Sequence, residues 1–376
     1  MNKICYITTI SDTIQAFFVP QLQYLSENGF SVTVVCSPDD ELKSILGDYI
    51  QYHPIMIPRG IATLSLLISI YKLRSFFIKE RFDIVQYSTP NAAFCSAIAA
   101  KLSGIRVRNY HLMGLRYLGA SGIFRIILKQ LEKYTCECST HIECVSKSNL
   151  ELAVQDKLFS AHKGTVIWNG SSGGIDLSRF DISHRQEYRA LVRKKYGILE
   201  HDFLFGFMGR ITVDKGINEI FEAFSRISNA KLMIIGPTEQ LDFLNQYLFK
   251  QTKKNHNIIF IGQVSDPERF YCAMDVLLLP SYREGFGNVV IEAAAMGTPA
   301  IVSDIPGPID TSIQNVTALW VPPKDVHALE ESMKKIINKP GLRSQLSKAC
   351  RPYVIHHFEQ QKLNAKILER KKELLQ

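Results

Sequence analysis

The stretch 275–299 places the tightest constraint on how this chain can fold. Residues 276–279 form an apolar run that ends at a proline, as expected of a strand buried on both faces of a parallel sheet. Gly285 and Gly287 follow in a tight loop, and from Asn288 the pattern is helical until a Gly-x-Pro stop. This order of strand, glycine loop and helix predicts a phosphate site, because a helix N-terminus presents unpaired N–H groups to an anion.

Two carboxylates flank this loop, Glu284 before it and Glu292 about one turn into the helix. The neighbours of Glu292 over 289–296 are otherwise apolar, so an unpaired carboxylate there would cost several kcal/mol. A polyol such as a ribose diol would supply hydrogen-bond donors to Glu292, and Glu284 could hold sugar hydroxyls. The alternative is a helix with one solvated edge on which Glu292 meets only water.

A second glycine loop carries two cations. Residues 203–208 predict a strand, 209–216 a loop and 217–227 an amphipathic helix. Arg210 and Lys215 therefore lie on a loop at the carboxyl end of a strand, where open α/β sheets bind ligands. Two fixed cations there could neutralise a diphosphate and stabilise it as a leaving group. The alternative is an ordinary solvated basic loop.

Both segments resemble signatures of retaining glycosyltransferase family 4, also called group 1, which has the GT-B fold. The first matches the E-x7-E signature, with seven residues between Glu284 and Glu292, and the second matches G-R-x-x-x-x-K-G. The resemblance implies an α/β fold with two Rossmann-like domains facing a cleft. It implies a donor site for a sugar nucleotide at Gly209, Arg210, Lys215, Gly262, Val264, Glu284, Gly285, Phe286, Gly287, Asn288 and Glu292.

The resemblance also assigns roles to individual residues. Arg210 and Lys215 would stabilise the departing diphosphate, Glu284 and the following loop amides would orient the sugar, and Glu292 would bind the ribose. His111, which follows a predicted strand at 105–107, matches a histidine that the family places beside the reacting centre. By itself, a histidine at a strand end is more often structural. The expected catalytic residues are His111, Glu284, Arg210 and Lys215.

The length of 376 residues predicts two domains. The resemblance implies an acceptor-binding domain over 1–180, a nucleotide-sugar domain over 181–355, and a helix over 356–376 of the kind that in this family often crosses back to the first domain. The turn at 8–13 lacks the G-x-G-x-x-G spacing that seats a dinucleotide, so the first domain is not expected to hold the nucleotide. The glycine-rich stretch 165–176 is the expected hinge.

Charge and hydropathy predict contact with a membrane surface. The net charge is +8, and the segment 59–133 contains twelve Lys and Arg against three acidic residues, with apolar helices expected over 61–82 and 122–134. Such a surface suits anionic lipid, although solvated edges of core helices would give the same pattern. The resemblance favours peripheral contact. No signal peptide or span is apparent, which predicts a cytoplasmic protein on the inner face of the cell membrane. Nucleic acid is not an expected partner, because no aromatic spacing suited to base stacking accompanies the cations.

No metal or other cofactor is expected, because the sequence contains no D-x-D triplet to clamp a diphosphate through a cation. The eight cysteines are expected to be free or buried thiols, since Cys136, Cys138 and Cys144 lack the pairing of a zinc site.

The resemblance implies a retaining transferase. It would move a hexose or N-acetylhexosamine from a UDP-sugar to a polyprenyl-diphosphate-linked saccharide in capsule or O-antigen biosynthesis. An epimerase of the same fold that acts on sugar nucleotides is the alternative, and it would need further acid/base carboxylates that the sequence does not identify. A non-catalytic binding partner is disfavoured, because Arg210, Lys215, Glu284 and Glu292 are all present.

Overall fold

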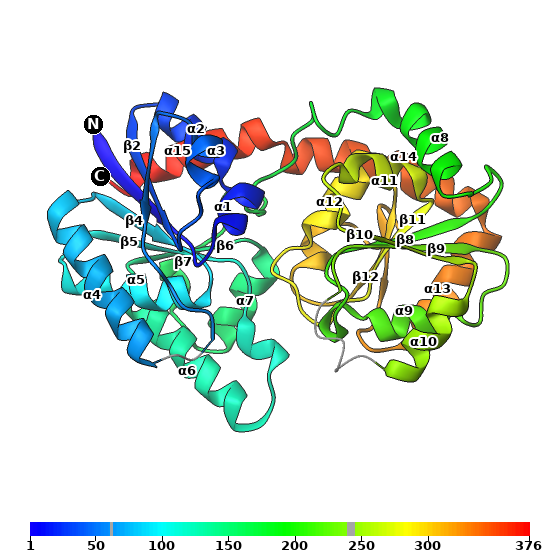
Figure 1. Cartoon of the computed structure of the whole chain (residues 1–376), viewed down its shortest axis with the longest axis horizontal. Coiled ribbons are helices and arrows are strands. Elements are labelled where there is room, and N and C mark those ends of the chain that lie inside the picture. The colour runs from blue at the N-terminus through cyan, green and yellow to red at the C-terminus, as the bar shows by residue number, and fades with distance from the viewer. Residues whose placement is uncertain (61–62, 239–244) are drawn as a thin grey trace. The chain divides into compact units, whose positions relative to one another are not determined.

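The computed structural model describes residues 1–60, 63–238 and 245–376, so the first two residues of the helix expected over 61–82 lie outside it (Figure 1). The chain divides into two compact units. The first comprises Met1–Gly174 together with Gln360–Gln376, and the second comprises Ile175–Glu359. The sequence analysis placed the corresponding domain boundaries after residues 180 and 355.

The first unit is built on a parallel sheet, as its alternation of strands and helices requires. In its described part, seven strands follow the order β3-β2-β1-β4-β5-β6-β7. Their bounds are β1 Asn2–Ile7, β2 Phe30–Cys36, β3 Ile50–Pro54, β4 Ile84–Tyr87, β5 Val107–Leu112, β6 His141–Cys144 and β7 Gly164–Thr165.

Helices cover both faces of this sheet, because its strands are apolar on both sides. In β1, Ile4 and Tyr6 pack into one core and Cys5 and Ile7 into the other. The first core lies under α1 Ser11–Phe17, α2 Val19–Glu27, α3 Leu42–Leu46 and α15 Gln360–Glu373. The second lies under α4 Thr63–Glu80, α5 Pro90–Leu102, α6 Gly122–Cys138 and α7 Lys147–Gln155.

The strand expected at 105–107 was placed too early. The structure places β5 at Val107–Leu112, so His111 lies within the strand and not after it. The sequence pattern failed here because β5 carries polar side chains that are buried inside the protein. Asn109 is buried and donates a hydrogen bond to Gln86 Oε1 at 2.9 Å. Similarly, α1 occupies part of the stretch 8–13 that was expected to be only a turn.

The carboxyl-terminal tail is two helices, not the single polar helix expected from residue 356. Helix α14, Pro340–Phe358, ends in the second unit, and α15 begins at Gln360 in the first. Lys371 of α15 is fully buried and bonds both carboxylate oxygens of Glu143 at 2.6 and 2.8 Å. Burial alone would raise the pKa of Glu143, but the Lys371 charge and hydrogen bonds hold it below its usual value. This ion pair fixes α15 to β6.

The second unit repeats the plan. Its described part forms a six-stranded parallel sheet in the order β10-β9-β8-β11-β12-β13. The strands are β8 Leu204–Met208, β9 Lys231–Ile235, β10 Ile258–Gly262, β11 Val276–Leu279, β12 Ala300–Ser303 and β13 Ala318–Val321. The strands expected at 203–208 and 276–279 agree with β8 and β11 to within one residue.

Helices again cover both faces of this sheet (Figure 1). One face carries α9 Ile217–Phe224, α10 Gln246–Lys254 and α13 Val326–Asn338. On the other face, α8 Arg185–Lys195 packs on α11 Pro267–Ala273, and α12 Asn288–Ala295 packs on α14.

In each unit the strand order reverses once, between β1 and β4 and between β8 and β11. At such a reversal the connections leave in opposite directions, and the carboxyl edge opens for a ligand. Among the helices that the structure describes, none is both long and apolar enough to cross a membrane. All eight cysteines are buried and unpaired, as predicted.

The buried carboxyl of Glu132 makes the stability of the first unit depend on pH. Glu132 accepts a hydrogen bond from Tyr110 Oη at 2.6 Å, and burial raises its pKa to about 7. Between its usual pKa and 7 the unfolded chain releases this proton and the folded chain keeps it, so stability is lost as pH rises through that window. We expect Glu132→Gln to add about 1 to 3 kcal/mol to the free energy of unfolding at pH 8 and little at pH 5.

Urea denaturation at both pH values measures this difference. Glu137→Gln, an exposed position on the same helix, is the control. A gain of equal size at pH 5 and pH 8 would contradict the assignment.

Candidate active site

Two loops meet at the carboxyl edge of the second unit's sheet, one after β8 and one after β11. Gly216 has a φ of +71°, and a Cβ at this position would overlap the carbonyl oxygen of Pro280. The backbone N–H of Tyr282 donates to the carbonyl oxygen of Asp214 at 2.9 Å. Only glycine permits this approach, so the glycine that follows Lys215 brings the two predicted loops together.

The contact joins the predicted cation to the predicted sugar-binding carboxylate. Lys215 Nζ lies 2.6 Å from Glu284 Oε1, and the hydroxyl of Ser281 donates to the same oxygen at 2.8 Å. The side chains of Lys215 and Glu284 are 19% and 12% exposed, so this ion pair is partly shielded from solvent but open to a ligand. Arg210 is exposed on the same loop as Lys215. Two cations and one carboxylate thus lie on adjoining loops.

Asp214 is a residue of this site that the sequence analysis missed. Its carboxylate accepts from Thr212 Oγ1 at 2.6 Å and pairs with Arg283 Nη2 at 3.0 Å. Burial would raise the pKa of Asp214, but the Thr212 hydroxyl and the Arg283 charge hold it below its usual value. Asp214 therefore braces one loop against the other. Its position beside Lys215, within the matched pattern, was the available signal.

The loop that begins at Glu284 leads into the N-terminus of α12. Gly287 precedes that helix with a φ of +103°, and Asn288 is its first residue. Gly307 packs behind the loop, where a Cβ would lie 3.0 Å from the carbonyl oxygen of Glu284. Phe286 is 4% exposed and packs edge-on against Phe358, with ring centroids 5.4 Å apart. The Phe286 side chain thus anchors the loop in the core, and a ligand can use only its backbone.

Glu292 has a hydrogen-bond partner within the protein. The hydroxyl of Tyr271 donates to Glu292 Oε2 at 2.7 Å, and burial raises the pKa of Glu292. Thr298 in turn donates to the carbonyl oxygen of Tyr271 at 2.8 Å. The Glu292 residue is half-buried. It therefore has a partner within the protein, as the first alternative requires, and is also partly exposed to solvent, as the second requires. Nothing in the sequence pattern singled out Tyr271.

Three glycines line the carboxyl ends of neighbouring strands. Gly209 donates its N–H to Ile235 at 2.9 Å, and Gly236 donates to Gly262 at 2.8 Å. A Cβ on Gly236 would overlap the Gly209 carbonyl oxygen. Bare backbone therefore runs from the Arg210 loop to Gly262, and the partly exposed Val264 follows two residues later. This edge suits a flat group held through main-chain atoms.

His111 belongs to the first unit, whereas the residues predicted to bind the donor belong to the second. It is 7% exposed, its Nε2 lies 3.2 Å from Ser172 Oγ, and its ring packs edge-on against Phe18. Burial lowers the pKa of His111 to about 4, so the imidazole is neutral at physiological pH. Ser172 comes from the expected hinge, a partner that the sequence analysis did not name.

The fold and these loops define the class of protein, a GT-B glycosyltransferase. Residues 189–352 match the family model "Glycosyl transferases group 1", and residues 21–173 match "Glycosyltransferase Family 4". The capsular polysaccharide biosynthesis glycosyltransferase CapM of Staphylococcus aureus is 33% identical over 364 residues, which cover 96% of this chain and 94% of that protein. The chain belongs to the group 1 glycosyltransferases, and the predicted family is confirmed.

Two further comparisons agree. The UDP-Gal:alpha-D-GlcNAc-diphosphoundecaprenol alpha-1,3-galactosyltransferase of Escherichia coli is 24% identical over 358 residues, covering 92% of this chain and 89% of that protein. The crystal structure of HepE from Anabaena in complex with UDP superposes with a TM-score of 0.80 at 16% identity, covering 99% and 100% of the two chains. The predicted GT-B fold class is confirmed.

The contact of Gly216 with Pro280 gives a direct test of the loop geometry. We expect Gly216→Ala to lower the free energy of unfolding by about 1 to 3 kcal/mol more than Gly197→Ala. Both glycines have positive φ, 71° and 65°, but nothing lies within 4 Å of a Cβ at Gly197. The difference therefore isolates the overlap from the backbone strain. Urea denaturation of the two variants measures it, and equal losses would show that the loops do not touch.

Proposed function

We propose that this protein is a retaining glycosyltransferase that transfers a hexose or N-acetylhexosamine from a UDP-sugar to a polyprenyl-diphosphate-linked saccharide. The observation that carries the proposal is the meeting of Lys215 and Glu284 at 2.6 Å beside the N-terminus of α12. A diphosphate is bound by cations and by the positive end of a helix dipole, and sugar hydroxyls donate hydrogen bonds to a carboxylate. This edge offers both within one loop contact.

UDP as the nucleotide is supported by the name of the E. coli relative and by the UDP complex of the Anabaena protein. Arg210 and Lys215 would bind the diphosphate, and the amides from Gly285 to Asn288 would stabilise its charge. Glu292 would accept from the ribose hydroxyls alongside Tyr271. The bare backbone at Gly262 and Val264 would receive the base.

Binding of the donor would divide the Lys215–Glu284 pair between two parts of one ligand. The ammonium turns to the diphosphate, and the carboxylate is then available to the sugar. In the proposed front-side reaction, the bond between the anomeric carbon and the phosphate oxygen breaks, and a bond to the acceptor oxygen forms on the same face. The acceptor proton passes to the departing diphosphate, so UDP leaves and configuration is retained.

We propose that Arg210, Lys215 and the N-terminus of α12 carry the charge of the leaving diphosphate without a metal ion. His111, neutral and buried at the end of β5, would act from the acceptor side by positioning. The proposal places the enzyme in capsule or O-antigen synthesis at the cytoplasmic face of the membrane. The names of the S. aureus and E. coli relatives support it, as do the cations and exposed apolar side chains of the first unit.

The reaction is tested with purified protein, a panel of UDP- and GDP-sugars and a lipid-diphosphate saccharide, in EDTA or with Mg²⁺. We expect UDP release matched by a heavier lipid product, at equal rates with and without Mg²⁺. Lys215→Ala should lower kcat by roughly 10²- to 10³-fold, as for the loss of one charge-stabilising group. Lys194→Ala, an exposed position on α8, should change it by less than about twofold.

Two results would contradict the proposal. An isomerised sugar nucleotide without UDP release would identify the epimerase. A product of inverted configuration, determined by NMR of the new linkage, would exclude the retaining reaction.

A further inference from the structure

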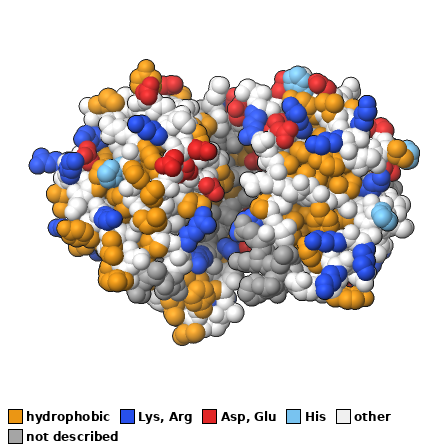
Figure 2. All heavy atoms as spheres, in the orientation of Figure 1, with side chains coloured by type: hydrophobic (Ala, Val, Ile, Leu, Met, Phe, Trp, Pro, Cys, Tyr) orange, Lys and Arg blue, Asp and Glu red, His pale blue; other side chains and the backbone are white. Residues whose placement is uncertain are grey.

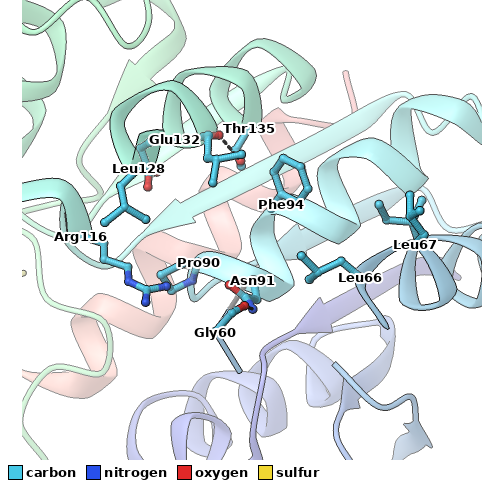
Figure 3. Close-up of a pocket in the computed structure, with 12 residues that line it drawn as sticks. Gly60, Leu66, Leu67, Pro90, Asn91, Phe94, Arg116, Leu128, Glu132 and Thr135 are labelled. Atoms are coloured by element: carbon cyan, nitrogen blue, oxygen red, sulfur yellow. Dashed lines mark hydrogen bonds between the residues drawn. The ribbon is translucent and has the colours of Figure 1, made fainter. Parts of the chain in front are cut away.

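A second site lies in the first unit, between three helices that the donor chemistry does not use. It is a pocket of about 300 Å³ bounded by α4, α5 and α6 (Figure 3). Leu66 and Ile70 of α4, Phe94 of α5, and Leu128 and Leu131 of α6 form its walls. An open apolar pocket of this size favours an apolar occupant.

Apart from Arg116, the polar side chains in its walls already make hydrogen bonds within the protein. Glu132 accepts from Tyr110 Oη at 2.6 Å, and the hydroxyl of Thr135 donates to the carbonyl oxygen of Leu131 at 2.9 Å. The side chain of Asn91 donates to the carbonyl oxygens of Pro58 and Gly60 at 2.6 and 2.7 Å. The occupant therefore need not supply hydrogen bonds along the pocket.

One end of the pocket carries a cation. Arg116 lines that end with its guanidinium beside Pro90, as Figure 3 shows. Within the described ranges, the guanidinium of Arg116 makes no ion pair or hydrogen bond. Pro90 follows β4, and Arg116 follows β5, so this end opens at the carboxyl edge of the sheet, where α/β domains bind ligands. His111 lies at the same end of β5.

The helices around the pocket expose apolar side chains to solvent. Leu64, Leu67 and Tyr71 on α4 and Ile123, Ile126 and Tyr134 on α6 are 46 to 72% exposed. Cations accompany them, including Lys72 and Arg74 on α4 and Arg125 and Lys133 on α6. Hydrophobic side chains are visible among Lys and Arg on the part of the first unit where these helices lie (Figure 2). The charge and apolar character suit an amphiphile with an anionic head.

We propose that this pocket binds the isoprenoid chain of the lipid-diphosphate acceptor, and that Arg116 binds its diphosphate. The saccharide then extends along the carboxyl edge of the sheet toward the end of β5 and His111. The assignment rests on the proposed lipid-linked acceptor. The position of Arg116 at the ligand-binding edge of the sheet favours the acceptor lipid over a bilayer phospholipid as the occupant.

Direct binding tests the assignment without transfer activity. Farnesyl diphosphate and inorganic diphosphate are titrated calorimetrically into the full chain, with excess UDP present to occupy the donor site. We expect the farnesyl compound to bind at least about tenfold more tightly than diphosphate, because only the former fills the apolar walls. Arg116→Gln should weaken both ligands.

Substitutions that fill the pocket distinguish binding of the isoprenoid chain from binding of the diphosphate. The substitutions Leu131→Trp and Leu67→Trp each place an indole ring in the pocket, from α6 and from α4. Leu131 and Leu67 are 38% and 63% exposed, so both variants should fold. Each variant should bind farnesyl diphosphate about tenfold more weakly than the wild type and bind diphosphate with unchanged affinity. Ile126→Trp is the matched control on α6, because it is exposed and lies outside the pocket lining. Unchanged farnesyl affinity in both filling variants, or equal loss in the control, would overturn the proposal.

Vesicles of phosphatidylglycerol and phosphatidylcholine without acceptor separate the two lipid sources. Co-sedimentation of the filling variants should match the wild type within about twofold. Loss of vesicle binding in step with farnesyl affinity would assign the pocket to a bilayer phospholipid and overturn the proposal. If the wild type binds farnesyl diphosphate as expected but transfers no sugar to any lipid acceptor, the proposed function fails while the isoprenoid site stands.

Discussion

The pairing of β8 with β11 is the constraint on which the proposed donor site depends. Val276 pairs with Phe205 and Leu277 with Gly206, although about 70 residues separate the two strands. Gly206 permits the packing around this join, because a Cβ there would overlap the sulfur of Met274. The strand order reverses between β8 and β11. The loops that follow these two strands therefore begin side by side at the carboxyl edge of the sheet. Without that register, Lys215 and Glu284 would not meet.

Two Lys–Glu pairs illustrate how burial decides what a charge can do. Lys371 and Glu143 are 0% and 2% exposed and join a helix to a strand, so their pair is closed to any ligand. Lys215 and Glu284 have similar geometry but greater exposure, at the mouth of a glycine loop. Removing one member of a closed pair leaves a buried charge and destabilises the fold. In the proposed reaction, Lys215 exchanges Glu284 for the diphosphate, and Glu284 exchanges Lys215 for the sugar.

Sequence patterns predicted the parts of the fold that depend on local chemistry. The patterns at 203–208 and 276–279 predicted β8 and β11, and the two glycine loops that follow these strands placed Arg210, Lys215, Glu284 and Glu292 at one edge. Contacts between distant residues could not be predicted in this way. The Tyr271–Glu292 hydrogen bond, the Phe286–Phe358 packing and the polar interior of β5 depend on tertiary neighbours that no periodicity reports. The break between α14 and α15 was missed for the same reason.

Hydrogen exchange of the backbone amides, with and without UDP, tests the central claim most directly. The account predicts that UDP slows exchange at 209–216, at 262–264 and from Gly285 through the first turn of α12. Exchange within Met1–Gly174 should change little. Protection confined to the first unit, or none at the two glycine loops, would contradict a donor site at the β8–β11 edge.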